Sequence, residues 1–237
     1  MHPSQNYTIG FLVFPDMLQF DLTGAYGVLA AGPGARPHLL WKRREPVVSS
    51  DGLIVTPTMS FTESADLHFD VLCVPGGGGV GALLADDAVL AFLREKGGQA
   101  RYLASVCTGA LALGAAGFLG GKRATTHWQS LDMLTAFGAV PVKERVVMDG
   151  NLITGAGVSA GIDMALTLAG RLWGDDAART IQLNMEYAPA PPYDGGTPES
   201  APARVVEALQ AKTAARQAQR REAVRAAAAR IAARKEA

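Results

Sequence analysis

A cysteine stands where a predicted buried strand ends and a helix begins. The strand is predicted over residues 101–106 and the helix over residues 108–116, so Cys107 occupies the sharp turn between them. A side chain at such a turn is lifted off the sheet, as the nucleophile of many hydrolases is. The helix N-terminus supplies partial positive charge and free N–H groups, which lower the pKa of a thiol. Cys107 is therefore a candidate thiolate nucleophile; the alternative is a buried, inert cysteine.

A run of glycines follows the predicted strand at residues 70–74. Gly76, Gly78 and Gly81 match the GxGxxG spacing of dinucleotide-binding loops, but a polyglycine run satisfies many such patterns. No acidic residue ends a following strand at the distance needed to bind a ribose. A glycine loop at the carboxyl edge of a parallel strand can also form an oxyanion hole. If this strand neighbours the one before Cys107, the loop faces the thiol.

Asp21 is a candidate proton donor. It lies between Phe20 and Leu22, and a carboxyl group buried among apolar side chains has a raised pKa. Such a group can donate a proton near neutral pH; the alternative role is a helix cap. His127 is more typical of a structural hydrogen-bonding residue than of a base. Cys73 lies within a predicted buried strand and is expected to be inert.

The elements that must position these residues alternate along the chain. Short apolar runs separate stretches of helical periodicity, which predicts an α/β fold with a mostly parallel sheet and helices on both faces. The strands are expected at residues 7–14, 38–42, 70–74 and 101–106, with hairpins around Asp51-Gly52 and Asp149-Gly150. The helices are expected at residues 19–31, 88–99, 108–116 and 159–173.

The C-terminal part has a different composition. Residues 188–202 are rich in proline and glycine, which predicts an extended crossing. Residues 204–237 contain nine basic and three acidic residues but neither glycine nor proline, which predicts a helix. Its thin apolar stripe consists of Val205, Leu209, Val224 and Ile231. We therefore expect an α/β domain over residues 1–203 and a basic helix that packs on this domain or on a dimer partner.

The balance of charged residues and the spacing of Cys and His indicate which partners are not expected. Lys plus Arg and Asp plus Glu each total 22, so the whole chain has no electrostatic tendency toward nucleic acid or anionic membranes. A nucleic-acid contact by the basic helix is disfavoured because base-reading aromatic residues are absent. The two cysteines and four scattered histidines lack metal-ligand spacing, so no metal is expected.

A cytoplasmic protein is expected from the first eight residues, which contain no Lys or Arg and do not resemble a secretory or transit signal. Residues 102–121 are uncharged, but they are too rich in small residues for a membrane span. The 49% of hydrophobic residues excludes a disordered chain.

Five segments resemble the ThiJ/PfpI superfamily, and within it the isocyanide hydratase family. They are FPDMLQFDLTG (14–24), VPGGGGVG (74–81), SVCTGALALGAAGFLGGKRATTHW (105–128), ERVVMDGNLITGAGVSAGID (144–163) and EYAPAPPYDGGTP (186–198). The resemblance implies a flavodoxin-like three-layer sandwich, a homodimer and a cofactor-free reaction. In that reaction an isocyanide gains water and becomes an N-formamide.

The resemblance also implies roles for individual residues. Cys107 would attack the terminal carbon of the isocyanide and form a thioimidate, and Asp21 would protonate this intermediate and help to activate water. The N–H groups of Gly77, Gly78 and Thr108 would surround the adduct, with the Thr108 hydroxyl as a polar partner. One nucleophile, one tunable carboxyl group and donor-rich loops are chemically consistent with these roles.

Thr108 distinguishes this chain from much of the superfamily. Its proteases, glyoxalases and deglycases generally have histidine after the cysteine, so Thr108 argues against peptide or glyoxal chemistry. Residues 204–237 are too short and uniform for the helix-turn-helix module of related transcription regulators. Ala156 and Val158 lie in a loop that is richer in glycine in some relatives, which leaves pocket shape and substrate size open. The alternative function is a noncatalytic sensor with an oxidisable Cys107.

Overall fold

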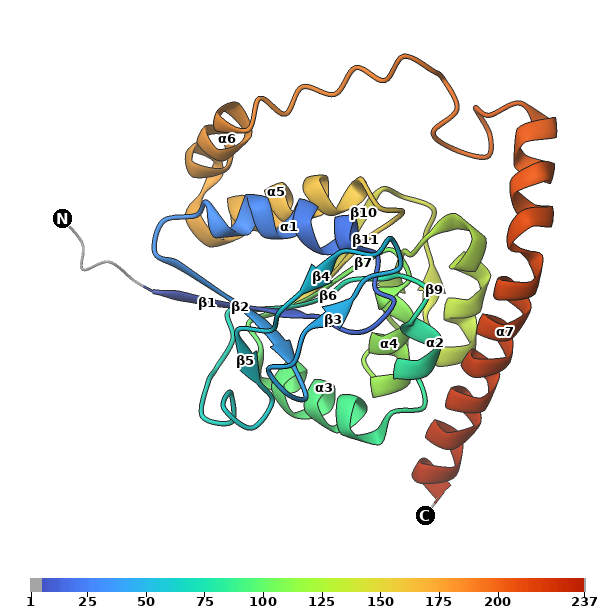
Figure 1. Ribbon diagram of the computed structural model, residues 1–237, viewed down its shortest axis with the longest axis horizontal. Coiled ribbons are helices and arrows are strands. Elements are labelled where there is room, and N and C mark those ends of the chain that lie inside the picture. Colours follow the sequence, from blue (N-terminus) through green and yellow to red (C-terminus); the bar gives the residue numbers. More distant parts are fainter. Residues whose placement is uncertain (1–5, 237) are drawn as a thin grey trace.

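A seven-stranded sheet forms the centre of the protein, shown in Figure 1 as a computed structural model that describes residues 6–236. The strand order is β10-β11-β7-β6-β1-β2-β5. All neighbours run parallel except β10, which pairs antiparallel with β11. The strands are β1 (Tyr7–Leu12), β2 (Ala35–Trp41), β5 (Met59–Ser60), β6 (Val71–Val74), β7 (Tyr102–Val106), β10 (Val146–Asp149) and β11 (Leu152–Gly155).

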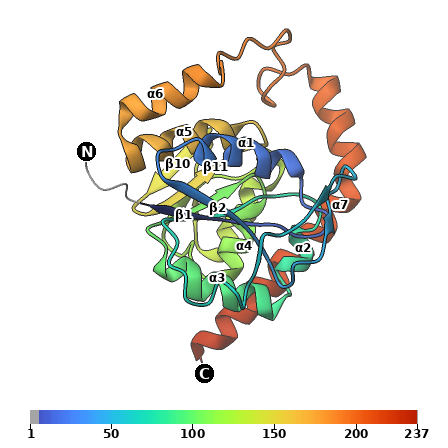
Figure 2. The same cartoon turned by 60° about the vertical axis from the view of Figure 1, so that its left-hand side comes forward.

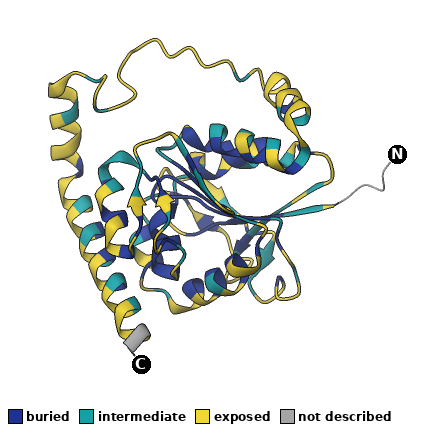
Figure 3. Ribbon diagram, turned by 180° about the vertical axis from the view of Figure 1, so that it is seen from behind, coloured by how far each residue is buried: buried dark blue, intermediate teal, exposed yellow. Residues whose placement is uncertain are grey.

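Helices cover both faces of the sheet, so its inner strands are buried (Figure 3). All four residues of β6 are buried, as expected for a parallel strand covered on both sides. One face carries α1 (Gln19–Ala30), α5 (Ala160–Trp173) and α6 (Asp175–Asn184). The other face carries α2 (Val80–Leu83), α3 (Asp87–Gln99), α4 (Gly109–Ala116) and the 3₁₀ helix η1 (Trp128–Phe137). The predicted three-layer α/β sandwich is thereby confirmed.

Both predicted hairpins are present. The first pairs β3 (Val47–Val48) with β4 (Ile54–Val55), and the second pairs β10 with β11. Gly52 and Gly150 have φ of 88° and 65° in the two turns, a conformation that glycine adopts at little cost. A further small sheet pairs β8 (Arg123–Ala124) with β9 (Val140–Pro141).

The helices α2, α6 and η1 and the short strands β5, β8 and β9 were not predicted from the sequence. α6 spans only ten residues, of which only Ile181 is buried, so few apolar side chains mark this helix in the sequence. The helix covers α5 rather than the sheet, which explains why most of its residues remain exposed. Among residues 6–236, no helix combines the length and apolarity needed to cross a membrane.

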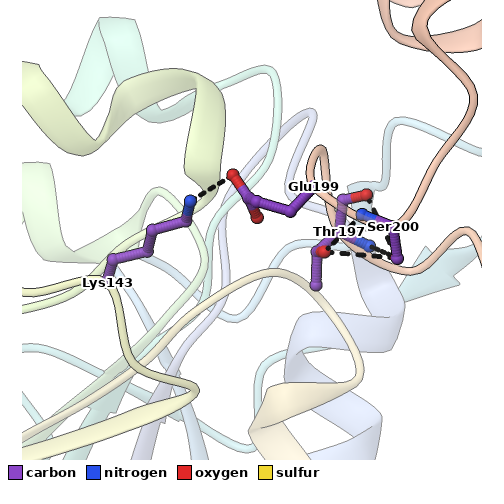
Figure 4. Close-up of polar contacts among 4 residues, drawn as sticks. All are labelled: Lys143, Thr197, Glu199 and Ser200. Carbon is purple, nitrogen blue, oxygen red and sulfur yellow. Dashed lines mark hydrogen bonds and ion pairs between the residues drawn. The ribbon is translucent and has the colours of Figure 1, made fainter.

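The basic C-terminal segment forms one long helix, α7 (Ala203–Glu236), which packs against η1, α4 and α2 (Figure 2). The extended segment 188–202 crosses from α6 to α7 along the outside of the molecule (Figure 1). Figure 4 shows the ion pair between Lys143 and Glu199 that attaches this segment to the domain. Within the segment, Thr197 and Ser200 hydrogen-bond with each other. Residues 1–5 and 237 of the two expected domains lie outside the described residues.

The buried face of α7 differs from the predicted stripe. Val205 and Leu209 are exposed, whereas Val224 is buried, as are Thr213, Arg220 and Ala227. These four buried positions, with Gln217 between them, follow spacings of three and four residues, which is the period of one helix face. Because this face contains polar residues, the pattern of apolar side chains in the sequence did not indicate that it is buried.

Candidate active site

Cys107 occupies a strained turn between β7 and α4. Its φ is 55°, a conformation that costs on the order of 1–3 kcal/mol for residues other than glycine. Hydrogen bonds hold this turn on both sides. The Cys107 N–H donates to the carbonyl oxygens of Gly155 (3.1 Å) and Ala156 (2.8 Å), and the Thr126 hydroxyl donates to the Cys107 carbonyl oxygen at 2.6 Å. The sulfur is thus fixed at the carboxyl edge of the sheet.

Glycines allow the loop after β6 to approach this turn closely. A Cβ atom at Gly109 would lie 2.1 Å from the Val74 carbonyl oxygen, and one at Gly76 would lie 2.6 Å from the Thr108 nitrogen. Both distances are too short for a real side-chain carbon. The glycine loop therefore lies beside the nucleophile turn, as the adjacency of β6 and β7 requires.

Asp21 lies in the first turn of α1 and has no exposed surface. Its Oδ2 accepts a hydrogen bond from the Gly76 N–H at 3.0 Å, while Oδ1 has no partner among the described residues. Burial raises the pKa of Asp21 to about 7, against the lowering effect of hydrogen bonds from the Cys107 thiol and the Gly76 N–H. The fold thus brings Asp21 close to the turn at Cys107, although the two residues lie far apart in the sequence.

The thiol of Cys107 has a raised pKa. Burial, followed by the charge of Asp21, raises it to about 12, although the N–H groups of Thr108 and Val158 hydrogen-bond to the sulfur and lower it. The N–H group at the start of α4 does lower the thiol pKa, as expected, but desolvation of a side chain that is only 5% exposed outweighs this effect. At neutral pH the thiol keeps its proton, and attack by sulfur requires a proton acceptor.

The glycine loop and Thr108 hold each other. The Thr108 Oγ1 accepts a hydrogen bond from the Gly77 N–H at 3.1 Å and lies 3.4 Å from the Gly77 carbonyl oxygen, to which it can donate. The Gly77 N–H, expected to surround an adduct, is therefore engaged by Thr108. The Gly78 N–H is not among the hydrogen-bonded groups of the described residues, and Gly78 lines the pocket above the thiol.

A pocket of about 140 Å³ opens above Cys107. The core domain contributes Leu18, Ser50, Gly77, Gly78, Cys107, Thr108, His127, Gln129 and Val158, and α7 contributes Arg216, Gln217 and Arg220. Amide side chains connect the two parts: the Gln217 Nε2 donates to the Gln129 Oε1 at 3.0 Å. The sequence analysis missed both Val158 as a donor to sulfur and the contribution of α7. The polar face of α7 was the signal that could have identified it.

His127 also borders the pocket, and it caps η1. Its Nδ1 accepts a hydrogen bond from the Gln129 N–H at 3.3 Å. Burial, followed by the positive charges of Arg220 and Arg216, lowers the pKa of His127 to about 4. The imidazole is therefore neutral at physiological pH and has the structural hydrogen-bonding role expected from the sequence.

The described residues outside this pocket offer no comparable set of catalytic side chains. A larger hollow of about 440 Å³ lies between α5 and α6 and is lined by residues that include Thr167, Arg171 and Gln182. Its lining residues include no cysteine, serine or histidine. Within residues 6–236, no cluster of three or more His, Cys, Asp or Glu side chains is arranged to hold a metal ion.

Comparison with known proteins gives three informative similarities. The model of the DJ-1/PfpI family matches residues 7–171. An isonitrile hydratase from Pseudomonas putida is 56% identical over 206 residues, which cover 87% of this chain and 90% of that protein. The crystal structure of a ThiJ/PfpI family protein from Pseudomonas syringae has a TM-score of 0.90 at 39% identity, covering 93% of this chain and 91% of that chain.

A regulatory protein is also similar. The HTH-type transcriptional regulator GbdR from Pseudomonas aeruginosa is 34% identical over 196 residues, which cover 78% of this chain and 53% of the regulator. About half of that protein therefore has no counterpart here.

Proposed function

This chain belongs to the DJ-1/PfpI family, and we propose that it is an isocyanide hydratase, which adds water to R–N≡C to give an N-formamide. The observation that carries this function is the 56% identity with an isonitrile hydratase, isonitrile being another name for isocyanide, over most of both chains. The Cys107 thiol supplies the nucleophile that such a reaction needs, and the neighbouring Asp21 carboxyl group supplies the proton carrier.

In the first step, the ionised Asp21 carboxylate accepts the thiol proton while the Cys107 sulfur bonds to the terminal carbon of the isocyanide. The same carbon then receives this proton from Asp21, which gives the thioimidate R–N=CH–S. A pKa of about 7 suits both tasks of Asp21, because the carboxyl group is close to half ionised at neutral pH. The raised pKa of the thiol makes this transfer necessary.

In the second step, Asp21 accepts a proton from water as the water oxygen attacks the thioimidate carbon, and it passes this proton to the nitrogen, which gives the tetrahedral intermediate R–NH–CH(OH)–S–Cys107. The C–S bond then breaks while the hydroxyl proton passes through Asp21 to the sulfur, which releases the N-formamide R–NH–CHO and regenerates the Cys107 thiol. The residues Gly78, Thr108 and Val158 line the pocket, and the N–H groups of Thr108 and Val158 hydrogen-bond to the sulfur; backbone N–H groups placed here would stabilise developing negative charge. Gly77 contributes by holding the Thr108 hydroxyl in place.

Turnover of a small aryl isocyanide tests these roles. The native protein should convert it to the N-formamide, and Cys107→Ala should form none, while the fold measured by circular dichroism remains intact. Cys73→Ala is the matched control, because Cys73 is the other free thiol and lies in β6; it should retain turnover. Asp21→Asn should reduce kcat/KM by roughly 10²–10⁴-fold. No turnover by the native protein would contradict the function, and turnover by Cys107→Ala would contradict the nucleophile.

A noncatalytic redox sensor is less consistent with the site. Oxidation of cysteine proceeds through an accessible thiolate, whereas Cys107 is 5% exposed and its pKa is about 12. Peroxide-dependent binding of a partner without isocyanide turnover would favour the sensor.

We also propose that the protein is a homodimer. The hairpin β3-β4 exposes apolar side chains to solvent: Val48, Leu53 and Ile54 are 52%, 53% and 70% exposed. The hairpin contacts the segment before α1, since the Ser50 N–H donates to the Met17 carbonyl oxygen at 2.9 Å. Clustered exposed apolar residues are typical of protein interfaces. A monomeric sedimentation profile would contradict this proposal.

We further propose a cytoplasmic location and a division into a catalytic domain, residues 1–203, and a helix, residues 204–237, that completes its pocket. The two free cysteines are consistent with a reducing compartment. Recovery of the native protein in the cytoplasmic fraction of its source cells would support this location, and recovery in a periplasmic or secreted fraction would contradict it.

A further inference from the structure

Arg220 is a buried cation beside the proposed nucleophile. It is 7% exposed, and its guanidinium contacts neutral acceptors: the Ser130 Oγ and the Gln217 Oε1, each at 3.4 Å, and the Gly77 carbonyl oxygen at 3.3 Å. No ion pair of the described residues includes Arg220. A cation withdrawn from water is costly unless a negative charge compensates it.

The lining of the pocket carries positive charge and no acidic side chain; Asp21 lies beside Cys107 but is not among the lining residues. Arg216 lies one helical turn before Arg220 and lines the same pocket, and none of the pocket-lining residues is Asp or Glu. The positive charges of both arginines reach the pocket interior, where they help to lower the pKa of His127. Arg221, on a neighbouring face of α7, differs because it pairs with Asp132 at 2.6 Å.

The shape of an isocyanide determines which part of it meets these arginines. The R–N≡C group is linear, so when its terminal carbon is held at the Cys107 sulfur, the substituent R points away from the sulfur. Part of the pocket wall is supplied by α7, which contacts the glycine loop through the hydrogen bond from Arg220 to the Gly77 carbonyl oxygen. A polar group on R therefore approaches Arg216, Gln217 and Arg220, and a guanidinium offers donors beyond the three contacts already present.

We propose that the preferred isocyanide carries a carboxylate on its R group and that Arg216 and Arg220 of α7 bind this carboxylate. The inference rests on the proposed hydratase function and names its substrate class. Guanidinium–carboxylate pairs are strong and directional, especially in partly desolvated sites. Arg216 is exposed in the free protein and is the residue free to close on the substrate, whereas Arg220 is already held by the Gly77 carbonyl oxygen.

The test compares two substrates of the same shape, 4-isocyanobenzoate and its neutral isostere 4-isocyanobenzamide. For the native protein, kcat/KM should be at least about tenfold higher for the carboxylate, and this ratio should fall as salt is added. Arg216→Gln should lower the ratio by about tenfold. Arg225→Gln is the matched control, because it removes the same charge from an exposed position of α7 that does not line the pocket; it should retain the native ratio. Equal kcat/KM for both substrates, or equal losses in both variants, would overturn the inference.

Alkylation of Cys107 by iodoacetate and iodoacetamide separates this inference from the function, because it requires no hydration. Peptide mass analysis distinguishes Cys107 from Cys73. The rate ratio of the anionic to the neutral reagent should be several-fold higher in the native protein and Arg225→Gln than in Arg216→Gln. This result without isocyanide turnover would retain the anion site and overturn the hydratase. The same ratio in all three proteins, with no charge preference in turnover, would overturn the anion site alone.

Discussion

Replacing Asp21 by Asn should remove a strong dependence of stability on pH. The carboxyl group is fully buried, and its Oδ2 accepts the Gly76 N–H. Asn has the same shape and can accept this hydrogen bond through its amide oxygen, but it does not ionise. The two proteins should therefore differ mainly in the free energy needed to keep a charged carboxylate in a buried site.

The size of the effect follows from the pKa of about 7 in the folded protein and the ordinary value of 3.8. Because the folded-state pKa is raised, protonated Asp21 stabilises the fold at low pH, and this stabilisation is lost as the pH rises through 7. Linkage gives a contribution of about 2.7 kcal/mol at pH 5 and close to zero at pH 8. Between pH 5 and pH 8, the free energy of unfolding of the native protein should therefore fall by roughly 2–3 kcal/mol more than that of Asp21→Asn.

Urea unfolding of both proteins at pH 5, 6, 7 and 8, with a reducing agent present, measures this difference. Subtracting the two curves removes the contributions of other groups such as His127, whose lowered pKa acts with the opposite sign. Asp194→Asn, at an exposed position, is the control and should give a curve parallel to that of the native protein. Parallel curves for the native protein and Asp21→Asn would refute the argument that burial controls this carboxyl group.

Three further predictions concern the same region and the proposed dimer. If ionised Asp21 accepts the thiol proton, kcat/KM should rise about tenfold from pH 6 to pH 8 and then level off; a flat profile would contradict this role. Gly109→Ala should lower the free energy of unfolding by roughly 1–3 kcal/mol, because the new Cβ meets the Val74 carbonyl oxygen at 2.1 Å. Gly81→Ala, in open space, should show no such loss in parallel urea unfolding. Ile54→Asp should shift the sedimentation profile from dimer to monomer without unfolding the chain, and an unchanged dimer would exclude the hairpin as interface.

The sequence predicted the central sheet well because its strands are short apolar runs that lie between helices. The turn at Cys107 and the glycine loop were likewise predictable, since few residue types permit such close backbone contact. The proximity of Asp21 to Cys107 follows only from strand order: α1 leaves β1, and β6 lies between β1 and β7. No local pattern contains that order.

The pKa of Cys107 could not be predicted because two opposing effects act on it. The sequence indicates the helix N-terminus that lowers the pKa, but the degree of burial that raises it depends on the packed structure. The position of α7 was missed for a related reason. Its buried face includes Thr213, Gln217 and Arg220. In a sequence, polar residues such as these predict a solvent-exposed face, and only the structure shows their partners on η1 and the glycine loop.

The helix α7, which supplies part of the pocket wall, lies outside the part of the chain that matches the family. The residues shared with the family, 7–171, contain the nucleophile turn, the carboxyl group and the glycine loop, whereas α7 lies entirely beyond them. Under the proposed role of α7, substitutions at Arg216 or Gln217 should change substrate preference and leave the nucleophile turn, the carboxyl group and the glycine loop unchanged. Two related proteins with the same nucleophile turn can therefore differ in substrate preference through this helix alone. A shared reaction does not by itself imply a shared substrate.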